Sequence, residues 1–452
     1  MVLHVYNTRI RKKMPFMPRE KKNVQLFVCG PTVYDYSHIG HARTYVAFDV
    51  IARYLRYKGY EVYYLQNITD IDDKIINRAR EEGVGWKELA DTYTRAYFAD
   101  VHALRITSVN NYSPATQYID AILRQVRALI EKGYAYELSD GIYYDVSRFT
   151  DYGKLSGRTA EDAEDTVSRI DDVIGKRNKA DFCLWKFLKP SEPYWESEFG
   201  RGRPGWHIED TAITETEFGA QYDIHGGAQD LIFPHHEAEI AQMEAVSGKK
   251  PMVKYWLHTG FLNVRGRKMS KSLGNFITIQ DALKKWDVDT LRFMLLSTHY
   301  RSPINYSEAA MAQAEDSVRY IRDSAKTGTK NVDVTAWVEK FVDAMDDDFN
   351  TPRVAALLLE MAKRINKTAE NLSPAIDEIG AVLGIDFQAK ERPLPPDVMA
   401  LIKEREELRR QKRWAEADRI REEVKKRGIL LSDTPEGTEW VVKTREYSDK
   451  SE

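Results

Sequence analysis

The chain has 452 residues, of which 42% are apolar and 30% are charged. This length exceeds what one hydrophobic core usually supports, so we expect several packed units. The formal net charge of −3 excludes binding of nucleic acid through overall charge, and any RNA contact must come from local basic surface.

The N-terminal residues carry no targeting pattern. Met1 to Tyr6 do not form a basic segment followed by an apolar one, and no run approaches the roughly 18 apolar residues that span a bilayer. The two cysteines, Cys29 and Cys183, are too few for a disulfide framework. We therefore expect a cytoplasmic protein that has no membrane partner, and we assign Cys183 to core packing.

An alternation of strands and helices begins near residue 24. Residues 24–30 predict a short buried strand that ends at Gly30 and Pro31, because proline lacks a backbone donor. From Gly40 the apolar residues follow helical spacing as far as Lys58. Residues 61–67 predict a second strand, and the carboxylates within residues 70–73 suit the N-terminus of a further helix. This order is typical of a parallel sheet.

A similar unit recurs downstream. Residues 222–226 predict a strand, residues 227–231 a loop, and residues 234–246 a helix with Pro234 near its first turn. Short strand signals such as residues 141–145 indicate an insertion between the two halves of the sheet. From about residue 310 the chain is predicted to be helical and charged.

Two short motifs carry the chemistry. His38-Ile39-Gly40-His41 lies at a predicted loop before a helix, and Lys268-Met269-Ser270-Lys271-Ser272 lies in a loop flanked by glycines. Each motif alone is weak evidence, since a histidine at a helix start is more often a cap and loop lysines are usually only solvated. Together they suit phosphate chemistry, in which imidazoles, a helix N-terminus and mobile ammonium groups neutralise phosphoryl oxygens.

The two motifs, intact and in this order, resemble the signatures of class I aminoacyl-tRNA synthetases. The resemblance implies a Rossmann-type sheet and catalytic roles for His38, His41, Lys268 and Lys271. It also implies that ATP, with Mg²⁺, reacts with an amino acid to form an aminoacyl-adenylate. Gly40 and Asp230 join these four as candidate ATP contacts. Asp230 follows a predicted strand at the edge where ligands bind, and its alternative role is a helix cap.

Further residues indicate which amino acid is activated. Cys29 ends the first predicted strand, and an isolated cysteine there is usually a small buried hydrophobic residue. His235 and Glu239 are four apart on a predicted helix, so both side chains lie on one face and can converge on an ion. Such a pair alone is usually only a surface contact.

Longer strings resemble the cysteinyl-tRNA synthetase family over nearly all of the chain. They are residues 27–35 (FVCGPTVYD), 67–74 (NITDIDDK), 205–209 (GWHIE) and 233–237 (FPHHE). The family's zinc ligands, two cysteines, a histidine and a glutamate, correspond here to Cys29, Asp210, His235 and Glu239. Asp210 is a departure from the cysteine usual at that position, and aspartate is also a competent zinc ligand.

The resemblance implies one zinc ion (Zn²⁺) in each chain, which selects L-cysteine through its thiolate. Serine differs only in an oxygen, which a shaped pocket discriminates poorly, whereas zinc binds a thiolate far more strongly than an alcohol. By the same resemblance, Gly30, Thr69 and Trp206 line the pocket for cysteine.

The C-terminal segment resembles the part of this family that reads the anticodon. Basic side chains between Arg405 and Arg427 are offset by many glutamates, so the pattern alone favours a solvated helix. The resemblance instead favours contact with tRNA(Cys), in which Trp414 either packs in the core or stacks on a base. By resemblance only, we expect a monomer.

The predicted fold class is α/β: a Rossmann-type catalytic domain with an inserted connective subdomain, then a helical bundle and a small C-terminal anticodon-binding module. The predicted divisions are residues 1–124 and 205–264 for the two halves of the catalytic domain, 125–204 for the insertion, 265–309 for the signature loop and stem-contact region, 310–390 for the bundle and 391–452 for the C-terminal module.

Two other functions share parts of this pattern. One is a cysteine ligase that joins cysteine to an amino sugar, which shares the adenylation core and lacks a full anticodon module. The other is a non-catalytic RNA-binding paralogue, against which the intact histidine and lysine motifs argue.

Overall fold

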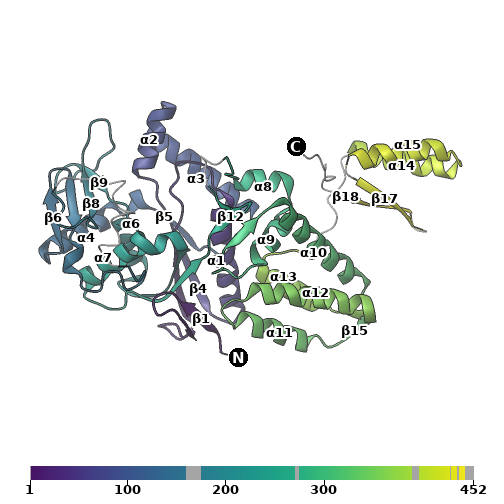
Figure 1. The fold of residues 1–452 in the computed structure, drawn as a ribbon, viewed down its shortest axis with the longest axis horizontal. Helices are drawn as coiled ribbons and strands as arrows, with labels where there is room; N and C mark the ends of the chain where they lie inside the picture. Colours follow the sequence, from purple (N-terminus) through teal and green to yellow (C-terminus); the bar gives the residue numbers. More distant parts are fainter. Residues whose placement is uncertain are drawn as a thin grey trace. The chain divides into compact units, whose positions relative to one another are not determined.

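The computed structural model describes residues 2–158, 175–269, 274–388, 396–427, 429–434 and 437–442. The chain divides into two compact units, residues 1–387 and residues 388–452, and Figure 1 colours it from the purple N-terminus to the yellow C-terminus. Within the described residues, no helix is both long enough and apolar enough to cross a membrane.

The first unit is built on a parallel sheet of five strands in the order β11-β10-β3-β4-β5. These strands are β3 (Asn23–Val28), β4 (Glu61–Ile68), β5 (Asn111–Pro114), β10 (Tyr222–Ala228) and β11 (Val253–Thr259). The α/β class with a parallel sheet is thus confirmed. Strands β3 and β10 are neighbours although they lie far apart in the sequence, so the strand order reverses between them. In open parallel sheets, ligands bind beyond the carboxyl ends of the strands at such a reversal.

Helix α1 (Ile39–Tyr57) connects β3 to β4 and ends at the cap residue Lys58, as the sequence predicts. Helix α2 (Asp73–Glu82) begins with Asp72, whose side chain accepts a hydrogen bond from the Lys74 amide and so caps the helix. The first predicted strand is correctly located, although β3 ends at Val28. Cys29 is therefore the first residue beyond the strand, at the ligand-binding edge.

The insertion forms a second sheet, which is antiparallel and has the order β6-β7-β8-β9. Its strands are β6 (Ala135–Leu138), β7 (Gly141–Tyr144), β8 (Phe182–Phe187) and β9 (Gly202–Pro204). Cys183 is buried on β8. The helices around this region are α3 (Trp86–Ala103), α4 (Ile119–Glu131) and α6 (Ile208–Phe218), with short 3-10 turns at Ala115–Tyr118 and Val146–Arg148.

The helix predicted from Pro234 starts later. Strand β10 is followed by a 3-10 turn (Gln229–Leu231) and an irregular turn (Ile232–His236), and α7 spans Glu237–Ser247. Phe233 has extended backbone angles (φ −138°, ψ 130°) because the residue before a proline disfavours the helical region. Pro234 therefore lies just before the helix, which begins three residues later than predicted.

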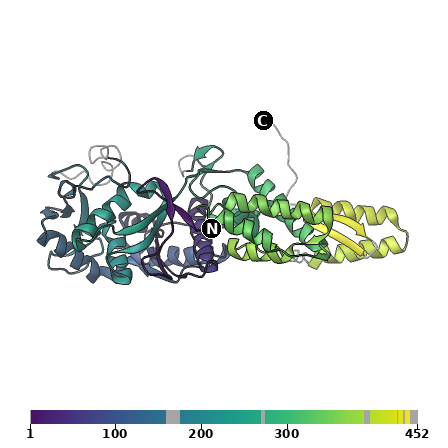
Figure 2. The same ribbon diagram turned by 90° about the horizontal axis from the view of Figure 1, so that it is seen from below.

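The rest of the first unit is mainly helical. The bundle, drawn in green in Figures 1 and 2, contains α10 (Glu308–Thr327), α11 (Thr335–Met345), α12 (Thr351–Thr368) and α13 (Ser373–Leu383). Two helices precede it, α8 (Ile279–Lys285) and α9 (Val288–Leu296). The remaining strands are β1 (His4–Asn7), β2 (Lys12–Pro15), β12 (Leu262–Val264), β13 (Arg267–Lys268), β14 (Ile304–Tyr306), β15 (Lys330–Asn331) and β16 (Glu370–Asn371).

The second unit has its own small core. Helices α14 (Pro396–Arg410) and α15 (Trp414–Lys426) pack against a hairpin of β17 (Ile429–Thr434) and β18 (Gly437–Val442). The prediction of a helical chain from about residue 310 onward holds for α14 and α15 but missed this hairpin, because tertiary packing of Ile429 and Leu431 on the helices supports strands that the local composition does not indicate.

Candidate metal and nucleotide site

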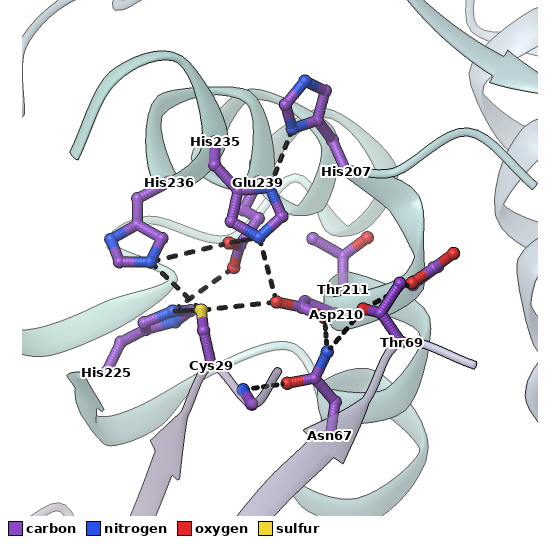
Figure 3. Close-up of polar contacts among 12 residues, drawn as sticks. Cys29, Asn67, Thr69, His207, Asp210, Thr211, His225, His235, His236 and Glu239 are labelled. Carbon is purple, nitrogen blue, oxygen red and sulfur yellow. Dashed lines mark hydrogen bonds and ion pairs between the residues drawn. The ribbon is translucent and has the colours of Figure 1, made fainter. Parts of the chain in front are cut away.

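Four side chains predicted to hold zinc meet at the edge of the sheet (Figure 3). Cys29 follows β3, Asp210 lies in the first turn of α6, His235 lies just before α7, and Glu239 lies on α7. Their ligand atoms all lie within 4.8 Å of one another. Cys29 Sγ is 3.3 Å from Asp210 Oδ2, and His235 Nε2 is 3.1 Å from Asp210 Oδ2 and 3.2 Å from Glu239 Oε1.

The electrostatics of this cluster suit a cation. Glu239 is fully buried, and neither carboxylate oxygen accepts a hydrogen bond from any of the described residues. Burial raises the pKa of Glu239, and burial together with the nearby Asp210 raises the pKa of the Cys29 thiol. Such groups are costly in their charged forms unless a positive charge balances them. One thiolate, one imidazole and two carboxylates form a donor set that zinc accepts, so the residues fit the metal.

A polar layer behind the cluster orients Asp210. Asn67 Nδ2 donates to Asp210 Oδ1 at 2.7 Å, while Asn67 Oδ1 accepts the backbone N–H of Gly30 at 2.6 Å. Thr69 Oγ1 donates to Glu209 Oε2 at 3.0 Å. At Gly30 an added Cβ would lie 1.7 Å from the carbonyl oxygen of Asn67, so only glycine fits at this position.

Sequence reasoning missed two histidines of this cluster. His225 on β10 and His236 next to His235 place Nε2 at 3.4 Å and 3.1 Å from Cys29 Sγ. In the sequence, His236 is marked only as part of the string at residues 233–237, and His225 only by its place on a predicted strand. The pairing of β10 beside β3 is needed to bring His225 to Cys29. Trp206, predicted to line the pocket, lies in the turn before α6, and its ring stacks on His235 at 4.2 Å between centroids.

The histidine motif caps helix α1. The backbone N–H groups of Gly40 and His41 donate to His38 Nδ1 at 3.1 Å and 3.3 Å, and the two imidazoles stack at 3.8 Å between centroids. We expected these N–H groups to point outward toward phosphates. The structure corrects this, since the cap side chain itself occupies them, as residues at this position commonly do.

The lysine motif lies largely outside the described residues, which include neither Lys271 nor the side chain of Lys268. Its flanks lie beside the histidine motif. The Ile39 N–H donates to the Ile277 carbonyl at 3.1 Å, and Thr278 forms a β-bridge with His38. The fold therefore places the segment that follows the lysine motif beside the histidine motif, at the start of helix α1.

One cavity of about 490 Å³ joins the two parts of the site. The described residues that line it include the predicted contacts Cys29, Gly30, His38, Gly40, His41, Thr69, Trp206, Asp210, Asp230 and His235. Asp230 is exposed in the 3-10 turn, two residues beyond the end of β10 rather than at the strand end. The candidate metal cluster and the histidine motif thus face the same space.

Family models cover most of the chain. Residues 15–316 match the model described as the tRNA synthetases class I (C) catalytic domain. Residues 340–388 match the DALR domain, and residues 391–440 match the cysteinyl-tRNA ligase anticodon binding domain. The last match disfavours the amino-sugar ligase, which was expected to lack a full anticodon module.

Similar curated proteins are named cysteine–tRNA ligase. The one from Thermoplasma acidophilum is 46% identical over 97% of this chain and 100% of its own length, and that from Thermococcus gammatolerans is 43% identical over 97% and 99%. Among solved structures, a methionyl-tRNA synthetase of Mycobacterium tuberculosis in complex with methionyl-adenylate has a TM-score of 0.59 at 17% identity, covering 80% of this chain and 87% of that one. That likeness shows the fold. The chain belongs to the cysteine–tRNA ligase family of class I aminoacyl-tRNA synthetases.

Proposed function

We propose that this chain, with Mg²⁺ present, joins L-cysteine to the AMP part of ATP with release of pyrophosphate, and then transfers the cysteinyl group to tRNA(Cys) with release of AMP. The observation that carries the proposal is the single cavity lined by Cys29, Asp210 and His235 on one side and by His38 and His41 on the other. Such a cavity can hold one small molecule with a thiol and a carboxylate beside a nucleotide.

The thiol end would be held by the cluster. Cys29, Asp210, His235 and Glu239 would bind one zinc ion, which supplies a strong bond to a thiolate and only a weak one to the hydroxyl of serine. Trp206 stacks on His235 and limits how that ring can turn. Gly30 and Thr69 line the same cavity and would leave room for the amino acid backbone.

The phosphate end would be held by the two motifs. His38 Nδ1 accepts two backbone N–H groups, and His41 Nδ1 faces the His38 N–H at 3.3 Å, so each ring carries its proton on Nε2. Burial lowers the pKa of His41 well below its usual value, which keeps that ring neutral. Both rings, together with Gly40, Asp230, Lys268 and Lys271, would then contact ATP while a cysteine carboxylate oxygen attacks the α-phosphorus and pyrophosphate leaves.

The remaining parts would serve the tRNA. We assign residues 1–124 and 205–264 to catalysis, 125–204 to the connective insertion, 265–309 to the signature loop and stem contact, 310–390 to a spacer bundle and 391–452 to the anticodon. The described surface of the second unit carries basic side chains such as Arg410 and Arg413 for phosphate contacts. We also propose a cytoplasmic monomer; the two buried cysteines, which form no disulfide, are typical of a reducing compartment.

The test is cysteine-dependent exchange of pyrophosphate into ATP, followed by charging of tRNA(Cys). The Asp210→Asn variant keeps the size of the side chain and removes its charge, and we expect a loss of about 100-fold or more in kcat/KM for cysteine. Asp316→Asn, at an exposed position on α10, is the control and should behave as the wild-type protein. Wild-type exchange that ignores cysteine, or cysteine transfer to an amino sugar instead of tRNA, would contradict the proposal.

A further inference from the structure

The cluster contains a second complete set of metal donors. Cys29, His225, His236 and Glu239 also place one ligand atom each within 4.8 Å of the others. The two sets share Cys29 and Glu239. Glu239 Oε1 lies 3.2 Å from His235 Nε2 and 4.0 Å from His236 Nε2, whereas Glu239 Oε2 lies 3.5 Å from His225 Nε2, so this one carboxylate faces the histidines of both sets.

The two additional histidines are oriented for metal binding. His225 Nδ1 lies 2.6 Å from the hydroxyl of Tyr222, and His236 Nδ1 lies 2.8 Å from His258 Nε2. Each imidazole therefore has a partner at one nitrogen and presents Nε2 to Cys29, which is the usual arrangement behind a metal-bound histidine. At Gly227 an added Cβ would come within 2.8 Å of the His236 ring, so glycine permits this close approach.

The spacing of the donors also fits zinc. With metal–sulfur bonds of about 2.3 Å and metal–nitrogen bonds of about 2.0 Å, the edges of a tetrahedron measure roughly 3.2–3.6 Å. From Cys29 Sγ the distances to His236 and His225 Nε2 are 3.1 Å and 3.4 Å, and His225 lies 3.5 Å from Glu239. His236 is 4.0 Å from Glu239, which a small rotation of either side chain would correct.

We infer that one divalent ion of the zinc type has two alternative positions in this protein. The outer position uses Asp210 and His235, the inner position uses His225 and His236, and both use Cys29 and Glu239. Two ions at once would place four positive charges against three negative ones in a buried site, which disfavours double occupancy. The inner set has one sulfur and two imidazoles, and zinc favours these donors over the second carboxylate of the outer set.

The two positions differ in access to substrate. Among the described residues that line the cavity are Cys29, Asp210 and His235, whereas His225, His236 and Glu239 are not among them. Both positions have four protein donors, but neither histidine of the inner position borders the cavity, so an ion there is closed off as in a structural site. An ion in the outer position borders the cavity, where a thiol can reach it. This inference rests on the proposed function, since the substrate thiolate would favour the outer position.

The first test counts bound Co²⁺, used in place of zinc, in purified protein. Asp210→Asn combined with His235→Gln removes the outer donors, and His225→Gln combined with His236→Gln removes the inner ones. We expect one Co²⁺ per chain with a thiolate-to-metal absorption band in the wild type and in each double variant, and none in the variant with all four changes. If the Asp210→Asn/His235→Gln protein binds no metal although it is as stable to unfolding as the wild type, the inner position does not exist.

The second test needs no variant and therefore does not depend on folding of one. X-ray absorption of the zinc-loaded wild-type protein reports the number of imidazole and sulfur ligands. We expect two imidazoles and one sulfur without cysteine, and one imidazole and two sulfurs with it. One imidazole under both conditions would overturn the inference. Wild-type protein that shows the expected change and does not activate cysteine would contradict the proposed function alone.

Discussion

Arg292 Nη2 lies 2.7 Å from Asp49 Oδ2, and both side chains are fully buried. Asp49 lies on α1, the helix that starts at the histidine motif, and Arg292 lies on α9. Arg292 also donates to the carbonyl of Leu383 at the end of α13, at 2.7 Å. This ion pair therefore connects the helix that carries His38 and His41 to the helical bundle.

Removing one partner of this ion pair should destabilise the protein far more than replacing both partners by apolar residues. We expect Asp49→Ala to lower the free energy of unfolding by about 3–5 kcal/mol, because it leaves the Arg292 guanidinium buried without its counter-charge. The double variant Asp49→Leu/Arg292→Met should lose clearly less than the sum of the single variants. Urea unfolding measures the free energy of unfolding of each variant. If the loss in the double variant equals the sum of the losses in the single variants, the pair is not coupled.

The same pair gives a prediction for pH. Burial alone would raise the pKa of Asp49, but Arg292 and Arg53 outweigh it and hold the pKa below its usual value. A lowered pKa in the folded state stabilises the protein above the pKa of the unfolded chain, about 4, and this contribution disappears as the pH falls further. Unfolding measured from pH 6 to pH 3 should therefore lose more stability in the wild type than in the Asp49→Leu/Arg292→Met variant. Equal losses of stability in the two proteins would contradict a lowered pKa of Asp49 in the folded state.

Gly30→Ala should damage both the fold and the site. The new Cβ would collide with the backbone carbonyl of Asn67 on β4, the residue whose side chain donates a hydrogen bond to Asp210. We expect a loss of stability of about 1–3 kcal/mol from the overpacked position and at least a 10-fold loss in cysteine activation. Gly85→Ala is the matched control, since nothing lies within 4 Å of its added Cβ. A fully active and stable Gly30→Ala protein would show that β3 and β4 can separate here.

His38 caps helix α1 and is proposed to contact ATP, and one pair of variants can separate these two roles. His38→Asn keeps an acceptor at the cap position of α1, whereas His38→Ala removes it, so we expect the alanine variant to be about 1 kcal/mol less stable than the asparagine variant. Both variants lack the imidazole, and both should lose about 100-fold or more in the rate of pyrophosphate exchange. Thermal unfolding together with exchange assays distinguishes the effects. An asparagine variant with normal exchange would limit His38 to capping.

Sequence reasoning succeeded where the signal is local. The alternation of apolar runs and helical stripes located β3, α1 and β4, because each pattern is complete within one element. Resemblance indicated Cys29, Asp210, His235 and Glu239 as one ligand set, and the fold brings these residues together. Their roles stay predictions until metal and activity are measured.

What sequence reasoning missed depends on pairing between distant segments. His225 reaches Cys29 only because Ile224 on β10 pairs with Leu26 on β3, a register that no local pattern encodes. The hairpin of β17 and β18 was missed for a similar reason, since its strands are stabilised by packing on α14 and α15. The late start of α7 follows from the extended backbone of Phe233, which a helical apolar pattern conceals.

Trp414 gives a test of tRNA binding by the second unit. Its side chain is 54% exposed, which excludes the core-packing alternative, and the Arg409 guanidinium lies 5.6 Å from the ring. An exposed aromatic ring beside a cation suits stacking on a base, so Trp414→Ala should weaken tRNA(Cys) binding by about 1–3 kcal/mol. Trp414→Phe keeps an aromatic face and should retain most of the affinity. Pyrophosphate exchange, which needs no tRNA, should be unchanged in both variants. Wild-type tRNA affinity of the alanine variant would place the recognised base elsewhere on the chain.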